Sequence, residues 1–475
     1  MMIILGALIL FVAVILVRTV RFQPKAQPEL SIEAVEFDRD KAVSNLAELI
    51  RCKTISYSDH SLEDDAEFEK LIEKLPGLYP NVFAKCEFSR LPDRALLFRW
   101  PGKTAAEPAV MMAHYDVVPV NEEKWEKPAF DAIIEDGVMW GRGTLDTKGT
   151  FNGALFAADT LIAQGFLPEH DVYLAFSGGE EVNGMGARNI VELFREKGIV
   201  PGIVVDEGGA VVENVFPGVK APCGLIGIAE KGMMNAQFRA VSPGGHASAP
   251  KPNMPVDTLS RACVDVVGHP FKMHLTKPVA EMFDTLGRHS TFLYRMIFAN
   301  LWCFGWVLDL LGKTSGGEMN ALLRTTVAFT QMEGSSARNV IPPEAKMVAN
   351  MRLNPADSVE SALEYLKKTV GNDKVEITAL ESFEPSRISR TDCDGWDRVA
   401  AAVGETWPGC IVSPYLMVQC SDSRHWGVIS DRVYRFSAMD LTTEERATIH
   451  GNNERVRLDG ICKAVEFYIR LMKKC

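Results

Sequence analysis

Histidines and carboxylates recur along this chain in short clusters whose side chains could together hold divalent cations. In order, the clusters are His114 with Asp116, Asp146, Glu180-Glu181, Asp206-Glu207 and His450. Imidazole and carboxylate groups suit zinc, and a catalytic zinc site keeps one coordination position open for water. A metal ion in such a site activates water and polarises a carbonyl group. The residue types therefore predict a hydrolytic metal centre.

Each cluster alone has a simpler interpretation. The pair His114 and Asp116 could be structural, and Asp146 beside Gly149 could lie in an ordinary turn. Glu180-Glu181 follows two glycines and could begin a helix, where carboxylates are favoured. The prediction therefore depends on the whole set in one chain.

The clusters lie where buried strands are expected to end. Residues 109–113 (AVMMA) lead into His114, residues 171–176 (DVYLAF) precede Glu180-Glu181, and residues 202–205 (GIVV) precede Asp206-Glu207. In open α/β sheets the working residues lie just beyond the carboxyl ends of the strands. Short apolar strands alternate with helical patterns from about Phe37 onward, which predicts an α/β fold.

The length of 475 residues exceeds one ordinary domain. We expect a catalytic domain built from residues 38–230 and 356–475, with a mixed sheet covered by helices on both faces. Residues 231–355 differ in texture, because strand-like alternation at 235–241 and 346–353 encloses a helical stretch. They predict an inserted α+β lid and dimerisation domain.

Within that insertion, residues 291–311 (TFLYRMIFANLWCFGWVLDLL) are dense in aromatic and aliphatic side chains. One interpretation is a buried helix of the lid core or a dimer contact. The other is an apolar surface that receives a long acyl chain or touches a membrane.

The N-terminus is apolar and uncharged up to Arg18, and Arg21 and Lys25 follow. Its length is at the lower edge of what spans a bilayer. We predict a transmembrane anchor or signal segment over residues 1–20 and a tether over 21–37. Because the start lacks the basic residues and small-x-small exit of a cleaved signal, membrane anchoring is preferred and secretion is the alternative.

The net charge of −11 argues against a nucleic-acid binder, which normally presents a basic surface. The ten cysteines show no C-x-x-C pair and are expected to be small buried side chains.

Together and in this order, the clusters resemble those of peptidase family M20, in particular its carboxypeptidase S and N-fatty-acyl-amino acid hydrolase branch. The resemblance covers about residues 38–475. It implies the two-domain α/β metallopeptidase architecture and two zinc ions per chain, with cobalt or manganese as other divalent metals.

The resemblance also implies a role for each cluster. His114 would bind one metal and His450 the other, while Asp146 would bridge both. Glu181 would complete the site of His450. The remaining ligand lies in Asp206-Glu207, and the sequence leaves open which of the two it is.

Three further residues would act on the reaction. Asp116 would accept a hydrogen bond from the far ring nitrogen of His114. Glu180 would be the general base that takes a proton from water and returns it to the leaving nitrogen. His246 in SPGGHASAP would stabilise the oxyanion, supplied in relatives across a dimer from the partner's lid.

Arg424 in QCSDSRHW, with Arg352 in NMRLNP and Asn339 in NVIPP, would bind the substrate. The two arginines could pair with a substrate carboxylate. Gln419-Cys420 stands where relatives usually carry Gly or Ala, so we expect a carboxylate pocket of altered shape.

The predicted reaction is di-zinc-dependent hydrolysis of N-acyl amino acids, with a fatty acyl group and reversal as further expectations. The alternative is a dipeptidase or carboxypeptidase that acts on short peptides. More remote alternatives are a one-metal hydrolase and a non-catalytic membrane-anchored binding protein. The expected partners are a small-molecule substrate, a membrane at the N-terminal segment and a second copy through the lid.

Overall fold

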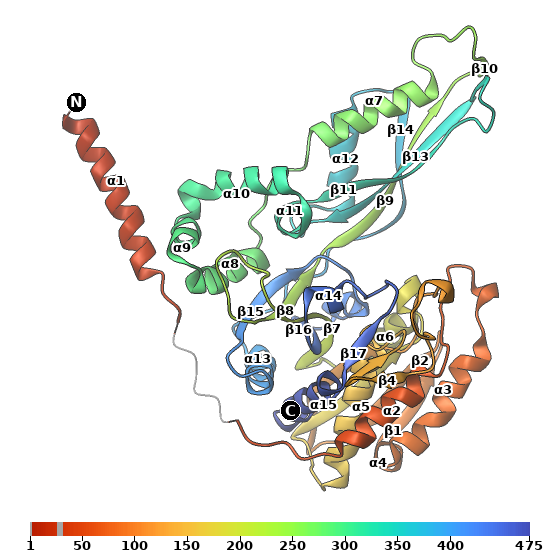
Figure 1. Ribbon diagram of the computed structural model, residues 1–475, viewed down its shortest axis with the longest axis vertical. Coiled ribbons are helices and arrows are strands. Elements are labelled where there is room, and N and C mark those ends of the chain that lie inside the picture. The colour runs from red at the N-terminus through yellow and green to blue at the C-terminus, as the bar shows by residue number, and fades with distance from the viewer. Residues whose placement is uncertain (1, 26–31) are drawn as a thin grey trace.

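The computed structural model describes residues 2–25 and 32–475 and confirms the predicted α/β fold (Figure 1). An 8-stranded mixed sheet has the order β1-β2-β6-β3-β7-β16-β8-β15. Its strands are β1 (Glu87–Leu91), β2 (Ala95–Trp100), β3 (Thr104–His114), β6 (His170–Ser177), β7 (Ile203–Val212), β8 (Cys223–Glu230), β15 (Ile411–Met417) and β16 (Val433–Leu441). Because β16 lies between β7 and β8, both ends of the chain build this sheet.

The apolar runs form central strands because helices cover both faces of the sheet. Strand β6 is buried at every position after His170. Alternate side chains of β2 face opposite layers: Phe98 packs in one apolar cluster and Leu97 in another. The first face carries α2 (Arg39–Ile50), α5 (Lys148–Ala163), α13 (Asp394–Thr406) and α15 (Leu458–Lys473), and the second carries α6 (Gly186–Glu196).

A second, 4-stranded antiparallel sheet has the order β11-β13-β9-β14 and stands away from the large sheet (Figure 1). Its strands are β9 (Gly232–Val241), β11 (Thr326–Glu333), β13 (Glu344–Leu353) and β14 (Val375–Phe383). Strand β13 alternates buried and half-buried residues, because helices α7 (Pro255–Gly268) and α12 (Val359–Val370) pack on one face. At the far tip, β10 (Gly245–His246) pairs with β12 (Val340–Ile341).

The expected return to the catalytic domain at residue 356 is too early. Helix α12 packs in the core of the smaller sheet, and β14 pairs with β9 along its length. The chain therefore leaves this layer only after Phe383. The alternating pattern at 346–353 predicts the last strand of this domain, whereas β14 completes the other edge of the sheet.

Helices α8 (Lys277–His289), α9 (Phe292–Ala299), α10 (Leu301–Ser315) and α11 (Gly317–Leu323) connect α7 to β11. They pack beside β15 in a cluster that includes Phe283, Phe298 and Leu416. The stretch 291–311 thus forms α9 and α10, which meet at a bend of 111°. Phe298 and Leu308 of this stretch are buried in that cluster, whereas most of its residues are exposed or half-buried, so it is only partly a core segment.

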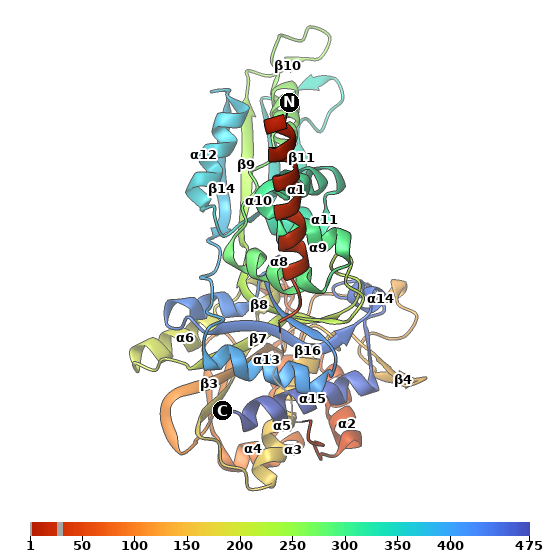
Figure 2. The same cartoon turned by 90° about the vertical axis from the view of Figure 1, so that its left-hand side faces the viewer.

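Helix α1 (Met2–Arg21) runs beside α9 and α10, in front of them in the view of Figure 2. Within residues 2–25 and 32–475, it is the single continuous helix long and apolar enough to cross a membrane. Of the predicted tether, residues 26–31 lie outside the described residues. Arg21 still belongs to α1, and residues 22–25 and 32–37 have no helix or strand.

The remaining elements include two helices with residues in the apolar core. They are α3 (Asp65–Leu78), α4 (Pro80–Lys85), α14 (Thr443–Arg446), the short strands β4 (Ile133–Glu135), β5 (Val138–Trp140) and β17 (Arg455–Arg457), and the 3-10 turns η1 (His60–Leu62), η2 (Glu122–Lys124), η3 (Glu180–Val182) and η4 (Asp422–Val428).

Candidate metal centre

The clusters meet at one edge of the large sheet. His114 is the last residue of β3 and pairs in parallel with Ser177, the last residue of β6. The turn η3, which carries Glu180 and Glu181, follows β6 directly. Strand β7 brings Glu207 to the same region. Parallel strands end on one edge, so residues distant in sequence become neighbours.

The two histidines lie on either side of Asp146. His114 Nε2 is 3.0 Å from Asp146 Oδ1 and 3.4 Å from Glu207 Oε1. His450 Nε2 is 3.0 Å from Asp146 Oδ2 and 3.1 Å from Glu181 Oε2. Asp146 therefore presents one oxygen to each imidazole, an arrangement that could hold two ions joined by one carboxylate.

The charges of the cluster favour bound cations. Burial, with nearby Glu207, raises the pKa of Glu180 well above its usual range. Burial likewise raises the pKa of Glu207 to about 8, and hydrogen bonds to Asp146 and Glu181 raise the pKa of His450 to about 10. Burial thus disfavours the charged forms of Glu180 and Glu207, and a bound cation would favour them.

One atom gives a more local indication. Glu181 Oε1 is buried and has no hydrogen-bond partner among the described residues. A buried carboxylate oxygen without a partner is costly, and a metal ion would satisfy it. Together with two imidazoles and carboxylates on facing elements, this donor set fits divalent cations such as zinc.

Asp116 orients the site in two ways. His114 Nδ1 lies 3.0 Å from the backbone carbonyl of Asp116, so this ring nitrogen donates there and leaves Nε2 for the centre. The Asp116 carboxylate, at 3.4 Å, is the more distant partner. It also accepts from the backbone N–H groups of Glu180 and Glu181, each at 3.2 Å. Asp116 thus fixes the turn that carries both glutamates.

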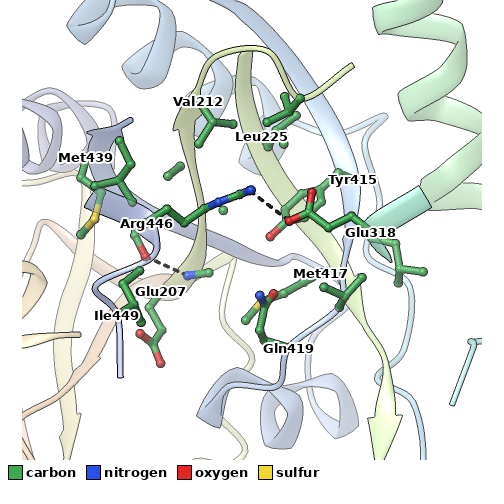
Figure 3. A pocket seen from close by; sticks show the side chains of 18 of the residues that line it. Glu207, Val212, Leu225, Glu318, Tyr415, Met417, Gln419, Met439, Arg446 and Ile449 are labelled. Atoms are coloured by element: carbon green, nitrogen blue, oxygen red, sulfur yellow. Dashed lines mark hydrogen bonds and ion pairs between the residues drawn. The ribbon is translucent and has the colours of Figure 1, made fainter. Parts of the chain in front are cut away.

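The structure distinguishes Asp206 from Glu207. Asp206 Oδ2 accepts a hydrogen bond from the Ser423 N–H at 2.8 Å and is buried beside η4. Glu207 lines the cavity at the centre and approaches His114 (Figure 3). Of this pair, the geometry brings Glu207 to the cluster and leaves Asp206 behind it.

Glu454 is a functional residue that the sequence interpretation missed. It is fully buried and accepts from the N–H groups of Gly143 at 3.1 Å, Leu145 at 2.7 Å and Asp146 at 3.1 Å. Arg142 Nη1 pairs with it at 2.6 Å. Glu454 therefore holds the loop that carries Asp146. The available signal was its place in TIHGNNE, the motif of His450.

A cavity of about 440 Å³ leads from the centre between the large sheet and helices α8 and α11. Its polar end is lined by Asp146, Glu180, Glu181, Glu207 and His450. Its other walls are mostly apolar and include Val212, Phe216, Leu225, Met282, Leu286, Leu322, Met417, Met439, Leu441 and Ile449. Figure 3 shows the ion pair of Arg446 with Glu318, 3.1 Å apart, at this cavity.

The two predicted substrate arginines lie near the segment that begins with Cys420. Arg424 Nη1 donates to the Ser421 carbonyl at 2.7 Å, and its guanidinium lies 4.9 Å from the centre of the Phe383 ring. Arg352 Nη1 lies 3.2 Å from Cys420 Sγ. Within residues 2–25 and 32–475, neither arginine pairs with a carboxylate. Both guanidinium groups could therefore bind an anionic group.

His246 and Asn339 lie elsewhere. The Ala247 N–H donates to the Asn339 carbonyl at 3.0 Å, which places the two residues together at β10 and β12. Figures 1 and 2 place this tip at the far end of the smaller sheet from the large one. Within one chain, the structure does not bring them to the metal centre. Arg352 and Asn339 consequently lie at opposite ends of β13, not together.

The sequence model of Peptidase family M20/M25/M40 matches residues 110–474. The chain belongs to this family. An N-fatty-acyl-amino acid synthase/hydrolase PM20D1 of Xenopus tropicalis is 32% identical over 99% of this chain and 93% of its own length. A probable carboxypeptidase S-like 2 of Dictyostelium discoideum is 31% identical with the same coverage.

Among solved structures, an M20 family metallo-carboxypeptidase of Sulfolobus solfataricus aligns with a TM-score of 0.67. The alignment covers 91% of this chain and 98% of that one, at 18% identity, and supports the fold. The family membership confirms the resemblance drawn from the clusters and the prediction of a metal-dependent hydrolase.

Proposed function

We propose that this M20 enzyme hydrolyses N-fatty-acyl amino acids with the help of two divalent cations, most simply zinc. The observation that carries the proposal is the cavity, because its apolar walls begin directly at the cluster of Asp146 and Glu207. An acyl chain could lie there with its amide at the cluster. The relative that bears the name of an N-fatty-acyl-amino acid synthase/hydrolase supports the same substrate class.

His114 and Glu207 would hold one ion, His450 and Glu181 the other, and Asp146 would bridge them. When bound, such ions lower the pKa of water and polarise the amide carbonyl. The assignment of Glu207 instead of Asp206 follows from the 3.4 Å approach of Glu207 to His114.

Glu180 lies within 4.8 Å of His114 and Glu207 at the same cluster, and among the described residues it forms no ion pair with either histidine, which suits a general base. It would take the proton from water and later deliver it to the leaving nitrogen. The reverse sequence would join a fatty acid to an amino acid. Arg424 and Arg352 would receive the α-carboxylate of the amino acid.

His246 and Asn339 would complete the site from the lid of a second copy. Their distance from the centre within one chain supports this arrangement. The oxyanion would then be stabilised only in a dimer. Helix α1 would anchor each chain in a membrane; removal of this segment and secretion is the alternative.

A carboxypeptidase acting on short peptides is the second candidate. The relative named probable carboxypeptidase S-like 2 favours it, and the same arginines would bind a peptide carboxylate. The two candidate functions require different apolar volumes in the cavity, because a peptide side chain occupies less apolar space than a fatty acyl chain.

A substrate comparison with the purified full chain tests the proposal. N-oleoyl-phenylalanine, N-acetyl-phenylalanine and an unblocked dipeptide are each assayed with and without a chelator. We expect chelator-sensitive cleavage with kcat/KM highest for the oleoyl substrate. Preference for the dipeptide would instead establish the carboxypeptidase, and no cleavage of any would revive a non-catalytic binding protein.

A further inference from the structure

Helix α10 presents a continuous apolar face that the metal centre does not use. Trp302, Trp306 and Leu310 follow one another at intervals of four residues and therefore share a face of the helix. They are 58%, 67% and 52% exposed. On α9, Phe292 and Leu293 are also exposed. Scattered surface apolar residues are normal, whereas a contiguous patch marks a contact with something apolar.

Helix α1 is joined to this face by specific contacts. The rings of Phe11 and Trp302 meet edge to face with centroids 5.7 Å apart. Thr19 is fully buried, and its hydroxyl accepts from the Asn300 amide at 3.2 Å. The exposed face of α10 is thus continuous with the apolar surface of α1.

The side-chain donors at the bend between α9 and α10 bond internally, whereas Asn300 Oδ1 is buried without a hydrogen-bond partner among the described residues. Arg18 donates twice to the carbonyl of Ala299, at 3.1 and 3.0 Å. The Asn300 amide also donates to the carbonyls of Ile15 and Met296. Donors that bond internally suit a bend where no water is available, as in lipid.

We propose that α9, α10 and α1 together form a lipid-facing surface, with Trp302 and Trp306 against the acyl chains. The occupant is lipid instead of a second copy of the chain because of α1. Only Ile15 and Thr19 of α1 are buried, so its apolar side chains are exposed nearly all round. Acyl chains can surround such a helix, whereas a protein partner covers one side.

The flanking residues agree with this placement. Basic side chains favour the headgroup layer. Arg21 and Lys25 follow α1 directly. Helices α8 and α11, next to α9 and α10, contribute Met282 and Leu322 to the cavity. An acyl chain would therefore have a short path from lipid to the centre, a consequence that rests on the proposed function; the membrane contact itself does not.

Fluorescence quenching by lipid tests the surface. The full chain is reconstituted in phosphatidylcholine vesicles whose acyl chains either carry bromine midway along their length or do not. Bromine quenches tryptophan at short range, so we expect lower emission in the brominated vesicles. The Trp302→Phe/Trp306→Phe variant should lose most of this difference, because Trp100, Trp125, Trp407 and Trp426 are buried in the large-sheet part.

The Trp140→Phe variant is the matched control, since Trp140 lies on β5 away from α10, and it should keep the full difference. Equal quenching in the wild type and the Trp302→Phe/Trp306→Phe variant would overturn the proposal. Tryptophan emission that is the same with and without bromine but shifts with protein concentration would also overturn the proposal. It would indicate that a second copy of the chain covers this surface. Hydrolysis of a water-soluble N-acetyl substrate, measured alongside, separates this result from failure of the proposed function.

Discussion

The carboxylate of Asp146 lies between the two histidines of the centre, with Oδ1 at 3.0 Å from His114 Nε2 and Oδ2 at 3.0 Å from His450 Nε2. Its backbone N–H is held in turn by Glu454 at 3.1 Å. The end of β3, with His114, and the segment after α14, with His450, therefore meet at this one side chain.

Asp146→Asn should reduce the metal content from two ions per chain to one or fewer. The amide keeps the size of the carboxylate, but its nitrogen cannot coordinate a cation. Elemental analysis of the purified variant measures this directly, and turnover should fall with it. Two ions retained in Asp146→Asn would show that Asp146 does not bridge them.

The pair Asp206 and Glu207 provides matched variants of neighbouring residues. Glu207→Gln should lose metal, because Glu207 approaches His114 at 3.4 Å. Asp206→Asn should retain metal, because its carboxylate faces the Ser423 N–H. Metal per chain and circular dichroism, measured on both, separate loss of a ligand from loss of the fold. Metal retained in Glu207→Gln and lost in Asp206→Asn would identify Asp206 as the ligand instead.

Glu180→Gln should keep both ions and the fold while kcat falls by roughly 10²–10⁴-fold, the usual contribution of a general base. Glutamine cannot take a proton from water, although it fits the same space. The variant is compared with the wild type for metal content and for kcat on the substrate that the wild type prefers. Retained turnover would remove the general-base assignment from Glu180.

Glu454→Gln should weaken metal binding or activity by about 10–100-fold, the usual effect of a residue that orients a metal ligand. The variant removes the charge that faces the buried Arg142 and weakens the acceptor for the Asp146 N–H. Chelator competition measures affinity, and thermal unfolding measures stability, which should also fall. The exposed Glu123→Gln should change neither.

Much of the site could be predicted from the sequence because its ligands lie at strand ends in recognisable order. His114, Glu181 and His450 are brought together as that order indicates. Glu454 could not be predicted, because no characteristic sequence spacing marks a buried carboxylate that accepts hydrogen bonds from backbone N–H groups. The sequence could not tell which of Asp206 and Glu207 faces the cluster, because adjacent residues of a strand differ only in the direction in which their side chains point.

The cavity could not be predicted, since its walls come from elements far apart in sequence. Leu225 lies on β8, Leu322 on α11 and Ile449 just after α14. The end of the smaller sheet was misplaced for a related reason. Strand β14 follows a helix, a pattern that also fits the α/β order of the first domain. Only its pairing with β9 assigns it to the smaller sheet.

Leu322→Trp should shorten the cavity and select against long acyl chains. Leu322 lines the cavity from helix α11. Displacing about two methylenes costs roughly 1.6 kcal/mol, or about 15-fold in kcat/KM. We therefore expect that loss for N-oleoyl-phenylalanine and little change for N-acetyl-phenylalanine. Val264→Trp, at an exposed position of α7, is the control. An equal loss for both substrates would place the acyl chain outside this cavity, because only a chain long enough to reach residue 322 can be sensitive to its size.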